Sequence, residues 1–342
     1  MSPPDPFRES NWSSVPIRDL GLKVEGTPLE PILSEFQGEL EQAGLRRLRP
    51  RFYLSTEWGV HFGSVAIAMP FYLARPELVE MQERKAGHVE GLNAPDILRY
   101  LRHEMGHVVN YAYRLYEQEE WVVQFGSITQ PYLEEYRPAL FSRRCVRHLP
   151  GWYAQKHPDE DWAETFAVWA TPGHDWRAEY AGQPAALAKL EYCDRTLVAV
   201  REKDPLDARA VLDEDVGELS ISVEQFYRSE PKSDAEFPRG LDGALLTIFD
   251  EVGRTEDGSA APPRKPASEL IRRTERDLLA NVYRWTGHFP ERTRVLVKHM
   301  AERADQLDLV YSADREGAAA VALTTLVTAL AMNWVHGGTY RP

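Results

Sequence analysis

Apolar residues recur at helical spacing along several stretches of this chain. The first stretch follows TPLE, residues 27–30, where Thr27 and Glu30 can form a capping box, and it stops at Gly44. Its apolar positions are Leu29, Ile32, Leu33, Phe36 and Leu40. Because this spacing places them on one side of a helix, the pattern predicts an amphipathic helix.

Helix start and stop signals, together with apolar spacing, predict three further helices downstream. One begins at NAPD, residues 93–96, and a second begins near Pro158 and stops at ATPG, residues 170–173. A third covers about 183–201. The apolar side of the first of these is formed by Leu98, Leu101, Met105, Val108 and Ala112. This helix is the one that carries the candidate chemistry.

Two short runs of β-forming residues lie between the first two helices. They are RFYLS, residues 51–55, and SVAIAMPFYLA, residues 64–74, with turn signals at Gly59 and Gly63 between them. Pro70 cannot donate a ladder hydrogen bond, which favours an edge strand for the second run or a strand that ends at Pro70. An edge strand beside an active-site helix would offer a docking surface for an extended peptide.

The C-terminal part of the chain is predicted to be separate from the rest. Residues 254–267 are rich in proline, glycine, serine and charge, which is typical of a linker. We therefore expect one domain over 1–253 and a small all-α unit over 268–342. Its helices are expected at 268–285, 291–308 and 314–334.

One segment of that unit, residues 318–334, contains 17 residues without a charge. It falls just short of the length that spans a bilayer, and no basic residues flank it. We expect a buried helix, with a C-terminal membrane anchor as the less favoured alternative.

Composition and charge indicate the class of protein, its partners and its compartment. The chain has 342 residues with 43% hydrophobic and 27% charged residues, as expected of a soluble globular protein. Its net charge of −13 disfavours binding to nucleic acid or to anionic membranes. Two cysteines, Cys145 and Cys193, are too few for a disulfide framework, although one bridge stays open. With no secretory signal at the N-terminus, we expect a cytoplasmic protein.

The strongest chemical signal is RHEMGHVVNY, residues 102–111. His103 and His107 lie four residues apart, so on a helix both imidazoles can reach one metal ion. Glu104, next to the first histidine, could take a proton from a metal-activated water. The alternative is a solvated helix face that happens to carry two histidines and a glutamate.

A zinc site of this kind needs a third protein ligand. The segment HPDEDWAETFAVWA, residues 157–170, presents Glu160 and Glu164 on one face of a predicted helix. The alternative interpretation is an acidic first turn, which helices favour in any case. From spacing alone, either carboxylate can reach the metal.

The two motifs together resemble a bacterial family of zinc-binding metallopeptidases of the gluzincin type, which pairs an RHExGH helix with an EDxAETxA helix. The resemblance extends over about residues 45–230. It implies an α+β fold with a zincin-like core, in which a small mixed sheet lies beside the active-site helices. It also implies one Zn²⁺ per chain, bound by His103, His107 and Glu160, with Glu164 orienting a histidine. Tyr153, seven residues before Glu160, corresponds to a tyrosine thought to stabilise the oxyanion in the lethal-factor-like branch. The alternative is an aromatic residue of the core, since Trp152 is its neighbour.

The implied function is hydrolysis of a peptide or amide bond in a peptide or protein substrate, with Glu104 as general base. Two alternatives remain open. One is a catalytically silent zincin-fold module that binds a partner, and the other is a metallohydrolase that acts on a small amide.

Overall fold

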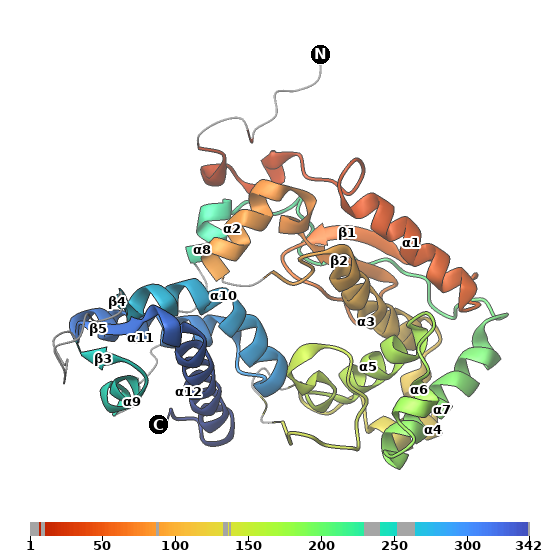
Figure 1. Cartoon of the computed structure of the whole chain (residues 1–342). Helices are drawn as coiled ribbons and strands as arrows, with labels where there is room; N and C mark the ends of the chain where they lie inside the picture. The colour runs from red at the N-terminus through yellow and green to blue at the C-terminus, as the bar shows by residue number, and fades with distance from the viewer. Residues whose placement is uncertain are drawn as a thin grey trace. The chain divides into compact units, whose positions relative to one another are not determined.

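The computed structural model describes residues 7, 11–86, 89–132, 136, 138–228, 240–251 and 264–340. The chain forms two compact units. The N-terminal unit contains residues 1–85 and 89–230, and the C-terminal unit contains residues 86–88 and 231–342. Both mix helices with small sheets, and helices predominate (Figure 1). The coarse expectation of a mixed α and β chain with a helical C-terminal region is confirmed.

The N-terminal unit consists of eight described α-helices and one small sheet, joined by short 3₁₀ turns. Its elements are α1 (Leu29–Gln42), β1 (Arg51–Ser55), β2 (Ala66–Pro70), α2 (Pro76–Ala86), α3 (Ala94–Ala112), α4 (Glu119–Phe125), α5 (Pro158–Ala170), α6 (Trp176–Glu179), α7 (Pro184–Val200) and α8 (Val223–Arg228). The four helices expected in this part of the sequence correspond to α1, α3, α5 and α7.

The sheet of this unit differs from the expected one. Strands β1 and β2 pair in parallel, with Arg51 opposite Ala66. On the other side of β2, Ala68 exchanges hydrogen bonds with Gly59, in which the Ala68 N–H donates over 2.8 Å. The expectation of a strand that ends at Pro70 is confirmed, because β2 ends there, and β2 is an edge of the two-stranded sheet. Its outer side is not free, however, since all of β2 is buried and the chain around Gly59 bridges to Ala68.

Helices α3 and α5 pack against each other at the centre of this unit (Figure 1). A Cβ atom at Gly106 of α3 would lie only 2.7 Å from the Cα of Ala163 in α5. The indole N–H of Trp162 donates to the Gly106 carbonyl over 2.7 Å, across the same contact. Glycine at position 106 thus allows the two backbones to approach this closely.

The C-terminal unit contains α9 (Leu241–Ile248), β3 (Asp250–Glu251), β4 (Arg264–Pro266), α10 (Ala267–Thr286), α11 (Pro290–Gln306), β5 (Leu309–Ser312) and α12 (Glu316–Gly337). Three helices were expected here, and α10, α11 and α12 correspond to them. The unit is not all-α, because β5 pairs antiparallel with both β3 and β4. These strands have two to four residues, too few for an alternating pattern to be recognised.

The predicted boundaries also differ from the observed ones. Residues 264–267, expected in the linker, form β4 and the first residue of α10, whereas 254–263 lie outside the described residues. Helix α9 and strand β3 belong to the C-terminal unit, although they were expected in a domain over 1–253. The reason is packing, since Leu241, Leu245 and Phe249 share the core of α10 to α12.

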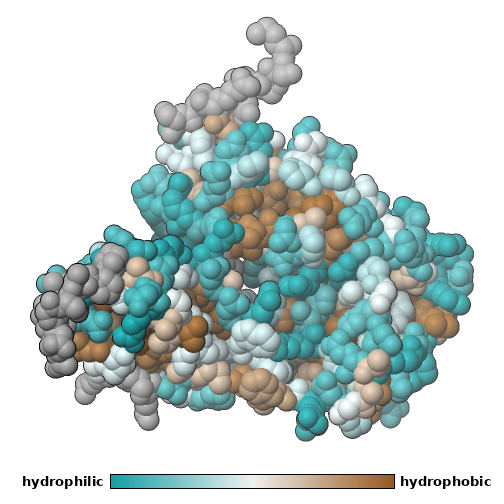
Figure 2. Space-filling view, viewed as in Figure 1, coloured by the Kyte–Doolittle hydropathy of each residue, from teal (hydrophilic) through white to brown (hydrophobic). Residues whose placement is uncertain are grey.

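The uncharged run of residues 318–334 lies within α12, which is long and apolar enough to cross a membrane by length and composition alone. One face of α12 is packed into the core of the C-terminal unit, through Ala319, Leu323, Val327, Leu330 and Ala331. Only 33% of the apolar stretch is buried, and Val321 within it is 68% exposed, so α12 is a partly buried helix. Most of the surface visible in Figure 2 is hydrophilic. Both cysteines are free, so no bridge joins Cys145 to Cys193.

We expect Gly106→Ala to destabilise the protein by about 1–3 kcal/mol, because the added methyl group overlaps the backbone of α5. Gly38→Ala in α1 is the matched control. A Cβ there meets no atom within 4 Å, so alanine should stabilise α1 by up to about 1 kcal/mol. Urea unfolding followed by circular dichroism measures both changes. Equal effects of the two substitutions would contradict the close contact between α3 and α5.

Candidate metal centre

Three side chains from α3 and α5 converge on one point between the two helices. The Nε2 atoms of His103 and His107 lie 3.3 Å apart. Oε2 of Glu160 lies 3.0 Å from Nε2 of His103 and 3.4 Å from Nε2 of His107. All three residues are buried, and their ligand atoms form a group that could hold a metal ion. The two histidines are therefore not part of a solvated helix face.

The spacing of these atoms fits a zinc ion. Zinc–nitrogen bonds of about 2.0–2.1 Å at tetrahedral angles hold ligand atoms about 3.3 Å apart. The three observed separations, 3.0, 3.3 and 3.4 Å, lie close to that value. Two imidazoles and one carboxylate are also a donor set that catalytic zinc sites use.

The second ring nitrogen of each histidine bonds to a different carboxylate. Nδ1 of His103 donates to Glu164 over 3.0 Å, and Nδ1 of His107 donates to Asp159 over 3.0 Å. A proton on each Nδ1 leaves both Nε2 lone pairs directed at the shared point. The carboxylates thus set the tautomer and orientation that a metal ligand needs.

Glu164 is fully engaged in this orienting role. Its oxygens also accept hydrogen bonds from the backbone N–H groups of His148 and Leu149, at 2.7–3.0 Å. Of the two candidate carboxylates, only Glu160 reaches both Nε2 atoms. The alternative of Glu164 as the third ligand does not agree with this arrangement.

Asp159 was not identified as a site residue from the sequence. Besides His107, it accepts hydrogen bonds from Asn110, over 2.7 Å, and from the Tyr111 hydroxyl. Its acidic neighbours in HPDED, residues 157–161, were explained as a favourable first helical turn. The sequence therefore gave no reason to assign Asp159 to the site, because only the packing of α5 on α3 brings its carboxylate to Nδ1 of His107.

The charges in this cluster favour a cation. Burial alone would lower the pKa of His103, but the hydrogen bonds to Glu160 and Glu164 outweigh it and raise the pKa to about 9. Burial would raise the pKa of Glu160, whereas the neighbouring His107 and His103 hold it well below the usual range. Buried carboxylates thus draw positive charge into the cluster, and a divalent cation can supply it.

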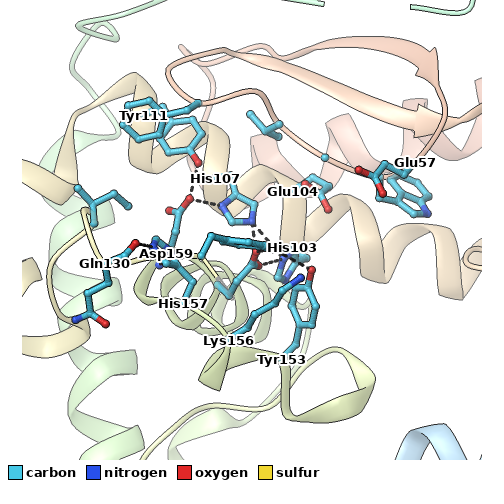
Figure 3. Close-up of a pocket in the computed structure, with 17 residues that line it drawn as sticks. Glu57, His103, Glu104, His107, Tyr111, Gln130, Tyr153, Lys156, His157 and Asp159 are labelled. Carbon is cyan, nitrogen blue, oxygen red and sulfur yellow. Dashed lines mark hydrogen bonds and ion pairs between the residues drawn. The ribbon is translucent and has the colours of Figure 1, made fainter. Parts of the chain in front are cut away.

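A cleft with a volume of about 570 Å³ opens onto this cluster (Figure 3). Glu104 of α3 is buried and lines the cleft beside the histidines. Burial raises the pKa of Glu104 to about 7, against the opposing effect of His103 and His107. The chain from Glu57 to Val60, which covers β2, forms another part of the wall. A carboxylate with a near-neutral pKa beside a candidate metal is suited to proton transfer.

Two tyrosines flank the open side of the cluster. The ring centre of Tyr153, which was singled out by resemblance, lies 5.6 Å from that of His103. The hydroxyl of Tyr132 lies 3.4 Å from the Tyr153 hydroxyl and donates to Oε1 of Glu160 over 2.8 Å. Tyr132 was missed from the sequence because the residues after α4 show no regular periodicity. It holds one oxygen of Glu160, which leaves the other directed at the histidines.

No protein-family model, curated protein or solved structure matches this chain. The resemblance to zinc-binding metallopeptidases therefore stays a prediction, and the interpretation of the centre depends on its geometry.

We expect Tyr132→Phe to weaken zinc binding by about 10–100-fold, because the substitution releases Oε1 of Glu160. Competition with a chromophoric chelator measures the affinity. Tyr113→Phe is the control, since it removes a phenol hydrogen bond of 3.1 Å to the Lys203 carbonyl, outside the cluster. Equal zinc affinities in the two variants would show that Tyr132 does not position Glu160.

Proposed function

We propose that this protein is a zinc-dependent metallopeptidase that hydrolyses a peptide or amide bond. The observation that carries the proposal is the convergence of two imidazole nitrogens and one carboxylate oxygen at zinc-like separations, beside a buried glutamate in a cleft. His103, His107 and Glu160 hold one Zn²⁺ per chain. Three protein ligands leave a coordination position open, as catalytic zinc sites require.

Zinc bound here supplies Lewis acidity to a substrate carbonyl and lowers the pKa of a water molecule. Glu104 acts as the general base that takes the proton from the attacking water. The proton then passes from Glu104 to the leaving amine. Glu104 can serve both steps because it is buried in the wall of the same cleft, directly after the proposed ligand His103 on α3.

The hydroxyl of Tyr153 stabilises the negative charge that develops on the carbonyl oxygen. Because Tyr132 donates its only hydroxyl proton to Glu160, Tyr153 is the donor in the 3.4 Å contact between the two hydroxyls. Rotation of the Tyr153 hydroxyl redirects this proton to the oxyanion. Hydrogen-bond donors that are already positioned where the oxyanion develops lower the activation barrier, because the protein does not have to reorganise during the reaction.

The substrate in this proposal is a peptide or protein, and its main chain lies along the segment from Glu57 to Val60. Nucleic acid and membrane surfaces are not expected partners, given the net charge of −13. The proposed location is the cytoplasm.

The second candidate function is hydrolysis of a small amide, because a cleft of about 570 Å³ also suits a small molecule. A silent binding module is disfavoured by the presence of Glu104 in the cleft wall.

Metal content is the first test. Protein purified without a tag or chelator should contain about one zinc per chain by elemental mass spectrometry. Glu160→Ala should bring the zinc content close to zero, whereas Glu164→Gln should weaken binding only about 10–100-fold, since it alters a hydrogen bond to a ligand. Glu35→Gln, on the exposed side of α1, is the control. Absence of zinc after incubation with the metal would reject the proposal.

Glu104→Gln tests the general base. The variant should keep its zinc and lose about 10²–10⁴-fold in kcat, because an amide cannot accept the proton. The assay compares unfolded casein, peptide pools and small amides, which also separates the two candidate functions. Wild-type activity on small amides alone would favour the second candidate. Full activity of the zinc-loaded variant would exclude Glu104 as the base.

A further inference from the structure

Lys156 is the only lysine or arginine among the described residues that line the cleft. The other charged residues of the lining are carboxylates, apart from the histidines. Asp159 and Glu160 are engaged by the histidines, and Glu104 and Glu57 add further negative charge. A single ammonium group in an acidic cleft therefore marks one place where an anion can bind.

The ammonium group is held in place by aromatic rings. Nζ of Lys156 lies 4.4 Å from the ring centre of Tyr132 and 5.2 Å from that of Tyr153. The backbone N–H of Lys156 donates to the Tyr153 carbonyl over 2.9 Å, which anchors its main chain at the end of η6 (Pro150–Gln155). Figure 3 shows Lys156 beside Tyr153 below the histidines. Cation–π contacts thus direct the charge toward the candidate metal centre.

Within the described part of the chain, Lys156 has no carboxylate partner. The buried Lys189 differs in this respect, because its ammonium group is paired with Asp161 between α5 and α7. Lysines on structural surfaces or in cores commonly pair with an acid or extend into water. The ammonium group of Lys156 is neither paired with an acid nor fully extended into water. It is half-buried over the rings of Tyr132 and Tyr153, whose hydroxyls contact each other and reach Glu160 through Tyr132.

We propose that Lys156 binds a carboxylate group of the substrate, and that this group is the C-terminal carboxylate of a peptide. This inference rests on the proposed peptidase function. Apart from the metal position, which the proposed mechanism uses for the scissile carbonyl and the attacking water, the lining is acidic, so Lys156 offers the substrate anion a separate cationic position. A C-terminal carboxylate lies at a fixed number of bonds from each main-chain carbonyl. Its capture by Lys156 sets which bond faces Glu104, and cleavage occurs close to the C-terminus.

A side-chain carboxylate of aspartate or glutamate offers the same chemistry from a different source. It would select peptides by sequence rather than by the position of their end. A cleft of about 570 Å³ accommodates only a short stretch of peptide, and a chain end needs no room beyond its last residue, which favours the C-terminal source.

The experiment uses three pools of synthetic peptides with the zinc-loaded full-length protein. The first pool has free C-termini and no acidic residues. The second has the same sequences with C-terminal amides, and the third is amidated but contains one aspartate or glutamate. Mass spectrometry records the rate and position of cleavage. The variants are Lys156→Met, which keeps the aliphatic stem without the charge, and Lys156→Arg, which keeps the charge.

We expect the wild type to cleave the first pool about 10-fold or more faster than the second, at a constant distance from the C-terminus. Lys156→Met should bring that ratio close to one, mainly through KM, and Lys156→Arg should retain most of it.

A ratio near one in the wild type, or a ratio unchanged in Lys156→Met, would overturn the inference while leaving the peptidase proposal intact. Preference for the third pool would assign the carboxylate to a side chain and reject the C-terminal source. If the wild type holds zinc and cleaves no pool, the peptidase proposal fails, and this inference fails with it.

Discussion

The backbones of α3 and α5 approach each other at Gly106 more closely than any residue with a Cβ atom at that position would allow. The candidate centre depends on this contact, because its histidines lie on α3 and its carboxylates on α5. A hydrogen bond from Trp162 to the Gly106 carbonyl holds the helices together at the same level. Small residues at a helix crossing thus convert two motifs about 60 residues apart into one cluster.

Burial of so many ionisable groups is costly unless each finds a partner. In the cluster, carboxylates contact both ring nitrogens of each histidine. Glu160 lies on the inner side of both histidines, while Glu164 and Asp159 bond to their outer nitrogens. The two outer carboxylates are held in turn by backbone N–H groups or by Asn110 and Tyr111. Such a network has one low-energy arrangement, which is the condition for a site with defined ligand geometry.

The cleft has two parts of different structure: a floor formed by α3 and α5, and a front formed by the chain between α4 and α5. Helices supply the histidines and carboxylates, whereas Tyr132, Tyr153 and Lys156 come from the irregular chain between α4 and α5. They contact one another through a hydroxyl pair and two cation–π contacts, and they reach the centre through Glu160. A rigid floor with a variable front is a common division in enzymes, because loops can change specificity without disturbing the core. In the proposed function, the floor holds the metal and the general base, whereas the front supplies the oxyanion donor Tyr153 and the substrate-binding Lys156.

Sequence alone determined the helices and the faces that they present. Apolar periodicity and helix start and stop signals predicted α1, α3, α5 and α7. The spacing of four residues placed His103 with His107 and Glu160 with Glu164, because residues four apart are neighbours on a helix. Tertiary structure decided which carboxylate meets which nitrogen, and it revealed Asp159 and Tyr132. It also placed Gly59 beside β2 and formed the small sheet of the C-terminal unit. These features arise from contacts between residues far apart in the chain, which local spacing does not encode.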